Sequence, residues 1–430
     1  MTVVRVGICG LGTVGAGVVN LLQRNRDEML RKTGVNIEVA QVGCRRDNAD
    51  CDISHVPVTR DVFDVVRNPD IDIVCELMGG TDVALEVVKQ ALSNGKHVVT
   101  ANKALIAQHG DELFALANAS GVGLKFEASI AGGIPIVKAI REGLAGNRIE
   151  RLAGIINGTS NYILTEMEAA GNRSFEDVLA EAQALGYAEA DPTFDVEGID
   201  AAHKLTLLSS IAFGVPLRFD AIFTEGISKV TSEDMSYASE FGYRIKHLGI
   251  TTKTQQGIEL RVHPTLIEKT HLLAQVNGVM NAVLVDSDAA GQTMYYGAGA
   301  GAGPTASSVV ADLIDLARDL SDVGRIPNLG FLPDALQSMP ILDINETQSC
   351  HYLRLHVLDR PGVLARISTI LGQQNISIES LIQKDVRKAL APIAIITDDI
   401  VEQSLVTAIT ELEALDEVIG TVQHIRVESF

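Results

Sequence analysis

The 430-residue chain has no tryptophan, few other aromatic residues (4%) and only five cysteines. The cysteines are odd in number and show no CxxC spacing, which argues against a disulfide framework and against a structural zinc site. Basic residues are outnumbered, because 35 Lys and Arg face 55 Asp and Glu and give a formal charge of −20. That charge disfavours binding to nucleic acid or to an anionic membrane surface.

Long apolar runs are also absent. No run reaches the roughly 18 residues of a membrane-spanning helix, and the first residues lack the layout of a secretory signal. Hydrophobic residues nevertheless make up 46% of the chain, and glycines number 38. At about 150 residues per domain, the length indicates about three domains. We therefore expect an acidic, multidomain α/β protein of the cytoplasm, with neither nucleic acid nor membrane as a partner.

Strand-like and helix-like segments alternate over the first 100 residues. Short β-branched runs predict strands at residues 3–9, 37–42, 71–77 and 98–100. Apolar residues at helical spacing predict helices at residues 14–22, 61–66 and 82–93. This alternation is typical of a Rossmann-type, doubly wound parallel sheet.

A glycine-rich turn of the form G-x-G-x-x-G follows the first predicted strand and opens the first predicted helix. Gly10 permits a tight turn, Gly12 lets the backbone approach a pyrophosphate, and Gly15 lets the helix pack close to the strand. A tight turn without a ligand is the alternative, but the position at the head of a βαβ unit favours a dinucleotide. The predicted contact residues are Gly10, Leu11, Gly12, Thr13, Val14 and Gly15.

The residues after the second strand bear on the choice between NADP and NAD. Arg45 and Arg46 suit a 2′-phosphate, which they would bind by charge-assisted hydrogen bonds. Asp47 is close enough in sequence to accept ribose hydroxyls instead. The sequence favours NADP and leaves NAD open.

Two further polar segments are candidates for chemistry. Thr100 and Lys103 follow the fourth strand, at the sheet edge where such folds bind ligands, although most lysines are solvated. Asp200 and Lys204 lie four residues apart in a strongly apolar helix, which predicts that they share one face. A surface ion pair is the alternative there. Asp195 is predicted to cap this helix, which would end near residue 213.

The last 80 residues predict the order βαββαβ, with strands near 350–357, 375–378, 391–397 and 418–427 and helices near 363–371 and 402–415. That order is typical of a ferredoxin-like module.

Five segments, taken together, resemble homoserine dehydrogenases over about residues 1–320. They are GLGTVG at 10–15, TANKALIA at 100–107, EASIAGGIPI at 127–136, INGTSNYIL at 156–164 and AEADPTFDVEGIDAAHKL at 188–205. The turn DRPGVL at 359–364, followed by NISI at 375–378, resembles an ACT domain.

The first resemblance implies a reversible NAD(P)H-dependent reduction of L-aspartate 4-semialdehyde to L-homoserine, in threonine, methionine and isoleucine biosynthesis. It implies that Lys204 donates and accepts the proton, with Lys103 in catalysis or in cofactor contact. Implied substrate-binding residues are Glu189, Asp200, Asp195, Gly158 and Thr159. Implied cofactor contacts, besides the glycine turn and the arginines, are Thr100, Lys103, Gly186 and Gly303. A monovalent-cation site, usually sodium, is implied at Glu127, Ile130, Gly132 and Ile134.

The implied architecture has four parts. A dinucleotide-binding domain spans 1–130 plus about 300–320, an inserted α+β catalytic and dimerisation domain spans 131–299, a linker spans 321–349, and an ACT domain spans 350–430. The ACT resemblance implies feedback regulation by an end product, threonine, in a homodimer or homotetramer. A purely oligomerising module is the alternative to an effector site.

Two other functions compete with this assignment. A non-catalytic sensor would bind NADP and threonine without turnover. Another ACT-linked dehydrogenase, such as one acting on 3-phosphoglycerate, would carry its glycine motif in mid-chain and use a His–carboxylate pair. This chain opens with its glycine motif.

Overall fold

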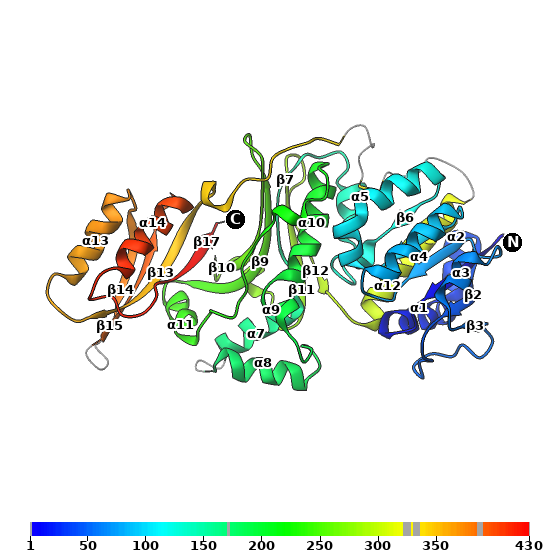
Figure 1. Cartoon of the computed structure of the whole chain (residues 1–430), viewed down its shortest axis with the longest axis horizontal. Coiled ribbons are helices and arrows are strands. Elements are labelled where there is room, and N and C mark those ends of the chain that lie inside the picture. The colour runs from blue at the N-terminus through cyan, green and yellow to red at the C-terminus, as the bar shows by residue number, and fades with distance from the viewer. Residues whose placement is uncertain (1, 170–172, 321–327, 330–335, 385–389, 430) are drawn as a thin grey trace. The chain divides into compact units, whose positions relative to one another are not determined.

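The computed structural model describes residues 2–169, 173–320, 328–329, 336–384 and 390–429 (Figure 1). The chain divides into two compact units. Unit 1 comprises Met1–Ile156, Asp200–Ile222 and Met280–Met339, and unit 2 comprises Asn157–Ile199, Phe223–Val279 and Pro340–Phe430. The four-part division expected from the sequence stays a prediction, and residues 321–327 and 330–335 of the expected linker lie outside the described residues.

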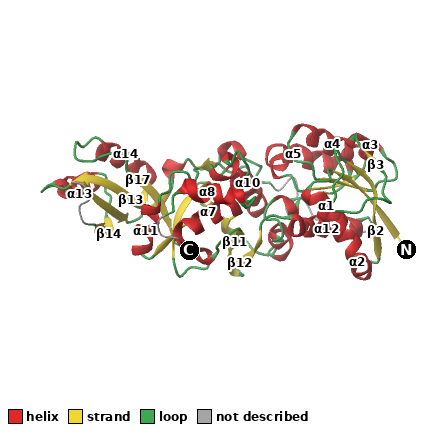
Figure 2. Cartoon of the chain, turned by 90° about the horizontal axis from the view of Figure 1, so that it is seen from below, coloured by secondary structure: helices red, strands yellow, loops and turns green. Residues whose placement is uncertain are grey.

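Unit 1 contains a parallel sheet of six strands in the order β3-β2-β1-β4-β5-β6, which confirms the predicted Rossmann-type sheet. Its strands are β1 (Thr2–Cys9), β2 (Val35–Gly43), β3 (Val58–Thr59), β4 (Ile73–Glu76), β5 (His97–Thr100) and β6 (Leu124–Lys125). One face carries α1 (Thr13–Arg24), α2 (Arg26–Thr33) and α12 (Ala302–Asp319). The other face carries α3 (Val62–Arg67), α4 (Asp82–Ser93) and α5 (Lys103–Ser120), as Figure 2 shows.

The core of this sheet explains the apolar spacing of its helices. Val6 and Ile8 of β1 are fully buried beneath Val18 and Leu22 of α1, whose spacing places both on one face of the helix. Leu313 of α12 joins the same cluster, so a segment late in the chain helps to bury the first strand.

A second group of strands in unit 1 is antiparallel. The strand β11 (Met280–Ser287) pairs on one side with β7 (Ile149–Ile155) and on the other with β12 (Gly291–Ala298). Unit 1 also holds most of α10 (Ile199–Phe213), nearly all of whose side chains are buried.

Unit 2 is built on an antiparallel pair of long strands, β9 (Tyr243–Lys253) and β10 (Ile258–Glu268). The short strand β8 (Phe223–Thr224) pairs with β10. The helices of this part are α7 (Gly158–Ala169), α8 (Phe175–Ala184), α9 (Thr193–Val196) and α11 (Ser232–Glu240).

The C-terminal module confirms the predicted βαββαβ order. Its principal elements are β13 (Gln348–Leu358), α13 (Val363–Gln373), β14 (Ile378–Gln383), β15 (Leu390–Thr397), α14 (Glu402–Glu413) and β17 (Gln423–Glu428), with the short β16 (Ile400–Val401) before α14. The side chains of alternate residues of β13 lie on opposite faces of the sheet. Leu353 and Leu355 pack beneath α13 and α14, whereas Tyr352 packs with Met235 of α11.

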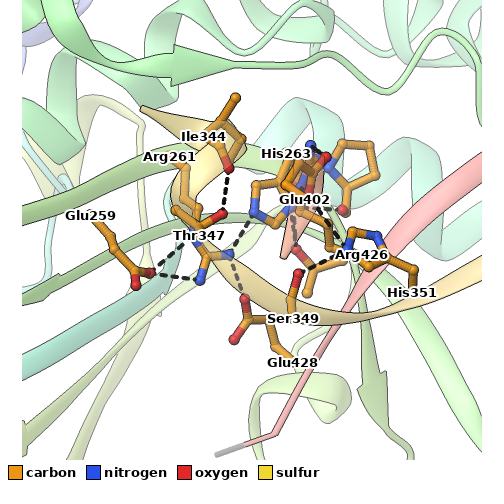
Figure 3. Close-up of polar contacts among 12 residues, drawn as sticks. Glu259, Arg261, His263, Ile344, Thr347, Ser349, His351, Glu402, Arg426 and Glu428 are labelled. Carbon is orange, nitrogen blue, oxygen red and sulfur yellow. Dashed lines mark hydrogen bonds and ion pairs between the residues drawn. The ribbon is translucent and has the colours of Figure 1, made fainter. Parts of the chain in front are cut away.

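The C-terminal module and the β9–β10 pair form one continuous sheet, because β17 pairs in parallel with β10. Figure 3 shows the charged side chains that lie along this junction. Arg426 of β17 binds Glu402 of α14, with Nε at 3.1 Å from Oε2, and Glu225 at 3.0 Å. Arg261 of β10 binds Glu428 of β17. These charges are buried but paired, as buried charges in proteins generally are.

Three local predictions differ from the structure. The helix expected from Asp195 to Phe213 is two helices, α9 and α10, because Gly198 adopts φ +81° between them and a Cβ there would lie 3.0 Å from His247 Cε1. The polar residues 157–161 by themselves predict a turn before a helix that starts near residue 162, but α7 already begins at Gly158. The glycine-rich residues 295–305 by themselves predict a loop before a helix that starts near residue 306, but α12 already begins at Ala302.

No helix among the described residues is long and apolar enough to cross a membrane. The five cysteines are all free thiols.

Candidate active site

A cavity of about 810 Å³ lies at the carboxyl ends of β1, β2 and β4. The strand order reverses between β1 and β4, so the cavity occupies the crevice where doubly wound sheets bind nucleotides. Its wall includes Gly10, Leu11 and Gly12, whereas Thr13, Val14 and Gly15 start α1 and do not line it. The remaining lining residues are 43–46, 60–62 and 77–83.

The glycine turn fits a bound pyrophosphate. Gly10 has φ +103°, and a Cβ there would lie 2.6 Å from the carbonyl oxygen of Leu77, so a larger residue would strain the turn. A Cβ on Gly12 would meet nothing within 4 Å. Gly12 precedes α1 and provides no side-chain cap, which leaves the first amide groups of the helix to a phosphate.

Three arginines line the same cavity. Arg45 and Arg46 are exposed at its rim, and Arg60 joins them. Asp47, the alternative acceptor for ribose hydroxyls, does not line the cavity, and its carboxylate binds Arg60 at 2.9 Å. The cavity rim beyond β2 therefore suits a phosphate better than a neutral ribose.

The structure brings Lys103, Asp200 and Lys204 together. Asp200 Oδ1 lies 2.7 Å from Lys103 Nζ, and Asp200 Oδ2 lies 2.6 Å from Lys204 Nζ. Lys204 also donates to the carbonyl oxygen of Ile156 at 2.7 Å. The side chains of Asp200 and Lys204 are only 5% and 10% exposed, whereas Lys103 is 35% exposed. The Asp200–Lys204 pair is therefore buried and is not the solvated surface pair that its spacing alone allowed.

The charge states follow from this geometry. Burial acts to raise the pKa of Asp200, but the ammonium groups of Lys204 and Lys103 outweigh it and hold that pKa below its usual range. Burial lowers the pKa of the adjacent His203 to about 4, so its imidazole is neutral at pH 7. At neutral pH the carboxylate thus fixes two lysine amines, and an ammonium so fixed can protonate a developing alkoxide.

The other residues predicted to bind substrate come together within unit 2. The side chain of Asn157 donates to Asp195 Oδ1 at 2.7 Å, and Ser160 Oγ donates to the carbonyl oxygen of Asp195 at 3.0 Å. Thr159 Oγ1 donates to the carbonyl oxygen of Tyr187 at 2.7 Å. Asp195 therefore anchors the start of α7, next to Gly158, and does not cap α10. Glu189 and Gly186 lie in the same segment and are exposed.

All four residues of the implied cation site are buried, and one of them, Glu127, contacts a second buried acid, Asp312. Glu127 and Asp312 are 1% exposed, and the amide of Glu127 donates to Asp312 Oδ2 at 2.8 Å. Burial, with the nearby Asp312, raises the pKa of Glu127 to about 7. The carbonyl oxygen of Gly132 accepts from Ser308 Oγ at 2.6 Å, and Ile130 and Ile134 are buried. Both carboxylate oxygens of Glu127 accept hydrogen bonds, from the backbone amides of Val137 and Lys138 at 2.9 Å each.

Not every predicted cofactor residue lies at the cavity wall. Thr100 is fully buried, with its hydroxyl bonded to Glu76 Oε2 at 2.7 Å, and it does not line the cavity. Gly303 lies in the first turn of α12 and is exposed. The sequence reading overlooked Glu76 and Arg60. Glu76 could have been identified from the sequence, because it is the one charged residue at the end of an apolar predicted strand.

Comparison with known proteins gives three family models that match in chain order. The model described as homoserine dehydrogenase, NAD binding domain, matches residues 10–127. The model described as homoserine dehydrogenase matches residues 135–314, and the ACT domain model matches residues 351–417.

Relatives extend over the whole chain. A homoserine dehydrogenase of Pseudomonas aeruginosa is 60% identical over 100% of this chain and 99% of its own length. One of Neisseria gonorrhoeae is 52% identical, with coverage of 100% and 99%. The crystal structure of a homoserine dehydrogenase from Thiobacillus denitrificans has a TM-score of 0.95 and 55% identity, and covers 99% of this chain and 98% of its own.

One further neighbour was solved with a nucleotide. A hyperthermophilic archaeal homoserine dehydrogenase in complex with NADPH has a TM-score of 0.64 and 27% identity, over 76% of this chain and 100% of its own. The glycine turn on the parallel sheet, the ACT module and these full-length relatives agree. The chain belongs to the homoserine dehydrogenase family, whose members are NAD(P)-dependent oxidoreductases acting on a CH–OH group.

Proposed function

We propose that this chain catalyses the reversible reduction of L-aspartate 4-semialdehyde to L-homoserine, with Lys204 as proton donor and acceptor. The observation that carries the proposal is the buried Lys204–Asp200 pair on α10, in the same unit as the dinucleotide cavity. This step would serve threonine, methionine and isoleucine biosynthesis.

Lys204 is the proton donor in the reduction and the proton acceptor in the oxidation. When bound, the nicotinamide supplies the hydride that reduces the aldehyde carbon. The ammonium of Lys204 then gives its proton to the carbonyl oxygen, which becomes the hydroxyl of homoserine. In the reverse direction the neutral amine accepts the hydroxyl proton, so the oxidation rate is expected to rise with pH. Asp200 and the Ile156 carbonyl hold the amine in one place.

The remaining residues take supporting roles in this proposal. Lys103 shares Asp200 with Lys204 and is assigned to catalysis or cofactor contact. The carboxylate of Glu189 is assigned to the substrate ammonium. Asp195, Gly158 and Thr159 are assigned to the rest of the substrate. Hydrogen bonds of Asp195 and Thr159 to Asn157, Ser160 and Tyr187 keep this segment in one conformation.

Lys204→Met tests the assignment, because methionine keeps most of the length of the lysine side chain but has no group that can donate or accept a proton. We expect kcat to fall by roughly 10²- to 10⁴-fold, with little change in the KM for the cofactor. The control is Lys89→Met, which breaks an ion pair with Glu112 in the same unit. A Lys204→Met enzyme that retained more than a tenth of the wild-type kcat would remove Lys204 from the proton transfer.

We also propose that the cofactor is NADP rather than NAD, supported by the arginines at the cavity rim. A monovalent cation, sodium by analogy with the family, is proposed at Glu127, Ile130, Gly132 and Ile134. Replacing sodium by a large organic cation in the assay should then lower activity, and a rate indifferent to this replacement would speak against the site.

Threonine is proposed as an effector at the C-terminal module, in a homodimer or homotetramer of the cytoplasm. The support is the ACT module, whose β17 continues the sheet of β10. Titrating threonine at fixed homoserine should lower the rate, and an unchanged rate up to saturating threonine would leave the module with an oligomerising role.

A further inference from the structure

Glu76 is a fully buried carboxylate at the carboxyl end of β4 that neither the motifs nor the proposed mechanism uses. It lies beside Thr100, its registered partner at the end of β5. The chain continues from Glu76 directly into residues 77–83, which line the cofactor cavity. From Thr100 it continues into the start of α5, whose first residue is Lys103.

Both oxygens of the Glu76 carboxylate accept hydrogen bonds, one from each side. Oε1 accepts from the amide of Met78 at 2.9 Å, and Oε2 accepts from Thr100 Oγ1 at 2.7 Å. Thr100 Oγ1 in turn accepts from the amide of Asn102 at 3.0 Å. One carboxylate therefore joins the cavity wall to the residues that precede Lys103.

Asn102 closes this network. Its side-chain Oδ1 caps α5 by accepting from the amide of Leu105 at 3.1 Å, and its Nδ2 donates to the carbonyl oxygen of Gly80 at 2.6 Å. The cavity wall at Met78 and Gly80 and the helix that carries Lys103 are thus fixed to one another through Glu76, Thr100 and Asn102. Burial raises the pKa of Glu76, and the hydrogen bonds from Thr100 and Met78 oppose that rise.

We propose that Glu76 is a positioning residue, which sets the cofactor-binding wall at residues 77–80 and the start of α5 at Lys103 in a fixed relation. It touches neither cofactor nor substrate in this role. Its effect on the reaction passes through two groups, the backbone of the wall and the Lys103 amine that binds Asp200. The inference rests on the proposed roles of the cavity and of Lys103.

Glu76→Gln is the sharpest variant, because glutamine has the same shape but only one acceptor oxygen. If its oxygen accepts from the Met78 amide, its NH₂ group faces Thr100 Oγ1, and the hydroxyl must turn to accept instead of donating to residue 76, so the two charge-assisted hydrogen bonds of the carboxylate are lost in either orientation. We expect the KM and the equilibrium dissociation constant for NADPH to rise about tenfold, the effect of losing one hydrogen bond to a charged group. We expect kcat to fall about tenfold as well, since small displacements of a catalytic group are costly.

The matched control is Asp72→Asn. Asp72 precedes the same strand at its amino end, where its Oδ2 accepts from the amide of Arg5 at 2.8 Å. Both variants are expected to lower the melting temperature, but Asp72→Asn should leave the KM for NADPH unchanged. If Glu76→Gln and Asp72→Asn have the same kinetic constants, Glu76 is only structural and the proposal fails.

A pair of variants at Thr100 gives an answer even if Glu76→Gln does not fold. Thr100→Val removes the hydroxyl that links Glu76 to Asn102, and Thr100→Ser keeps it. We expect Thr100→Val to lower kcat and Thr100→Ser to restore most of it, and equal activity in the two variants would contradict the proposal. Failure of the proposed function is a separate outcome, since it is read from Lys204→Met.

Discussion

Asp200 holds two lysine amines at once, one on each carboxylate oxygen. A buried carboxylate with one cation is stabilised by that single contact, and removal of the partner leaves a costly unpaired charge. Here the carboxylate keeps one partner when either lysine loses its proton. A change between the charged and neutral forms of Lys204 would therefore not leave Asp200 unpaired, which supports the role proposed for Lys204 as proton donor and acceptor.

Arg45 and Arg46 should decide the choice of cofactor. Replacing both by alanine removes the charges that would bind a 2′-phosphate, so kcat/KM for NADPH should fall roughly 10- to 100-fold, while kcat/KM for NADH changes little. Steady-state kinetics with the two cofactors measures this. Arg31→Ala, which breaks an exposed pair with Glu28 on α2, is the control. An equal loss with both cofactors would contradict a phosphate-specific role.

At the scale of secondary-structure elements, the parallel pairing of β17 with β10 joins the C-terminal module to the rest of unit 2. The junction is not apolar, because Arg426 and Arg261 are each about as buried as the core leucines around them. Their carboxylate partners come from several elements: Glu402 from α14, Glu428 from β17 itself, and Glu225 from just after β8. Buried ion pairs stabilise this junction, so its stability is expected to depend on each of these charges.

Arg426→Met tests that sensitivity. The substitution leaves the buried carboxylate of Glu402 with only the His351 imidazole, at 3.4 Å, and burial lowers the pKa of that imidazole, so it carries no compensating charge at pH 7. The free energy of unfolding should therefore fall by about 3–5 kcal/mol. The control is Arg366→Met on α13, where the arginine is 52% exposed and pairs with Glu417, and its cost should be less than about 1 kcal/mol. Urea unfolding followed by circular dichroism measures both. Equal losses in the two variants would mean that the junction does not depend on this pairing.

At the scale of the whole molecule, the two units differ in their buried titratable groups. In unit 2, His247, His263 and His351 are buried and His424 is half-buried, and loss of hydration lowers the pKa of each below 6.5. Unit 1 also has one such histidine, His203, whose pKa burial lowers to about 4, but burial raises the pKa of its buried carboxyl groups, to about 7 in Glu127 and to about 6 in Asp312. The units should therefore respond to acid in opposite directions.

The sign follows from proton binding. Below pH 6.5 the unfolded imidazoles bind protons that the folded ones do not, so unit 2 loses stability as the pH falls. At pH 5.5 each histidine contributes up to about 1.4 kcal/mol of that loss. Between about pH 7 and 4.5 the carboxyl groups of Glu127 and Asp312 bind more protons in the folded chain than in the unfolded chain. As the pH falls through this range, these two groups therefore raise the free energy of unfolding of unit 1.

Hydrogen exchange at pH 7.5 and 5.5, corrected for the intrinsic rate, measures this difference. We expect protection to fall in β13 and β17 of unit 2 before it falls in β1 and β4 of unit 1. A chain that opened first at β1 and β4 in acid would contradict the assignment of these charge states.

Short-range features were determined by the sequence alone. The glycine turn at 10–15, the alternation of strands and helices before residue 100, and the βαββαβ order after residue 350 all depend on neighbouring residues, whose backbone preferences and apolar spacing are local properties. The same holds for the pairing of Asp200 with Lys204, since one helical turn separates them.

Only the tertiary structure decided which distant groups meet. Lys103 reaches Asp200 because α5 and α10 pack in one unit, and Glu76 reaches Thr100 because β4 and β5 are neighbours in register. Asp195 was predicted to cap α10, yet it binds Asn157 and Ser160, because the backbone turns at Gly198 between α9 and α10. The physical reason is the same in each case. Several local conformations are compatible with the neighbouring residues, and the burial of side chains and the pairing of distant segments stabilise one of them.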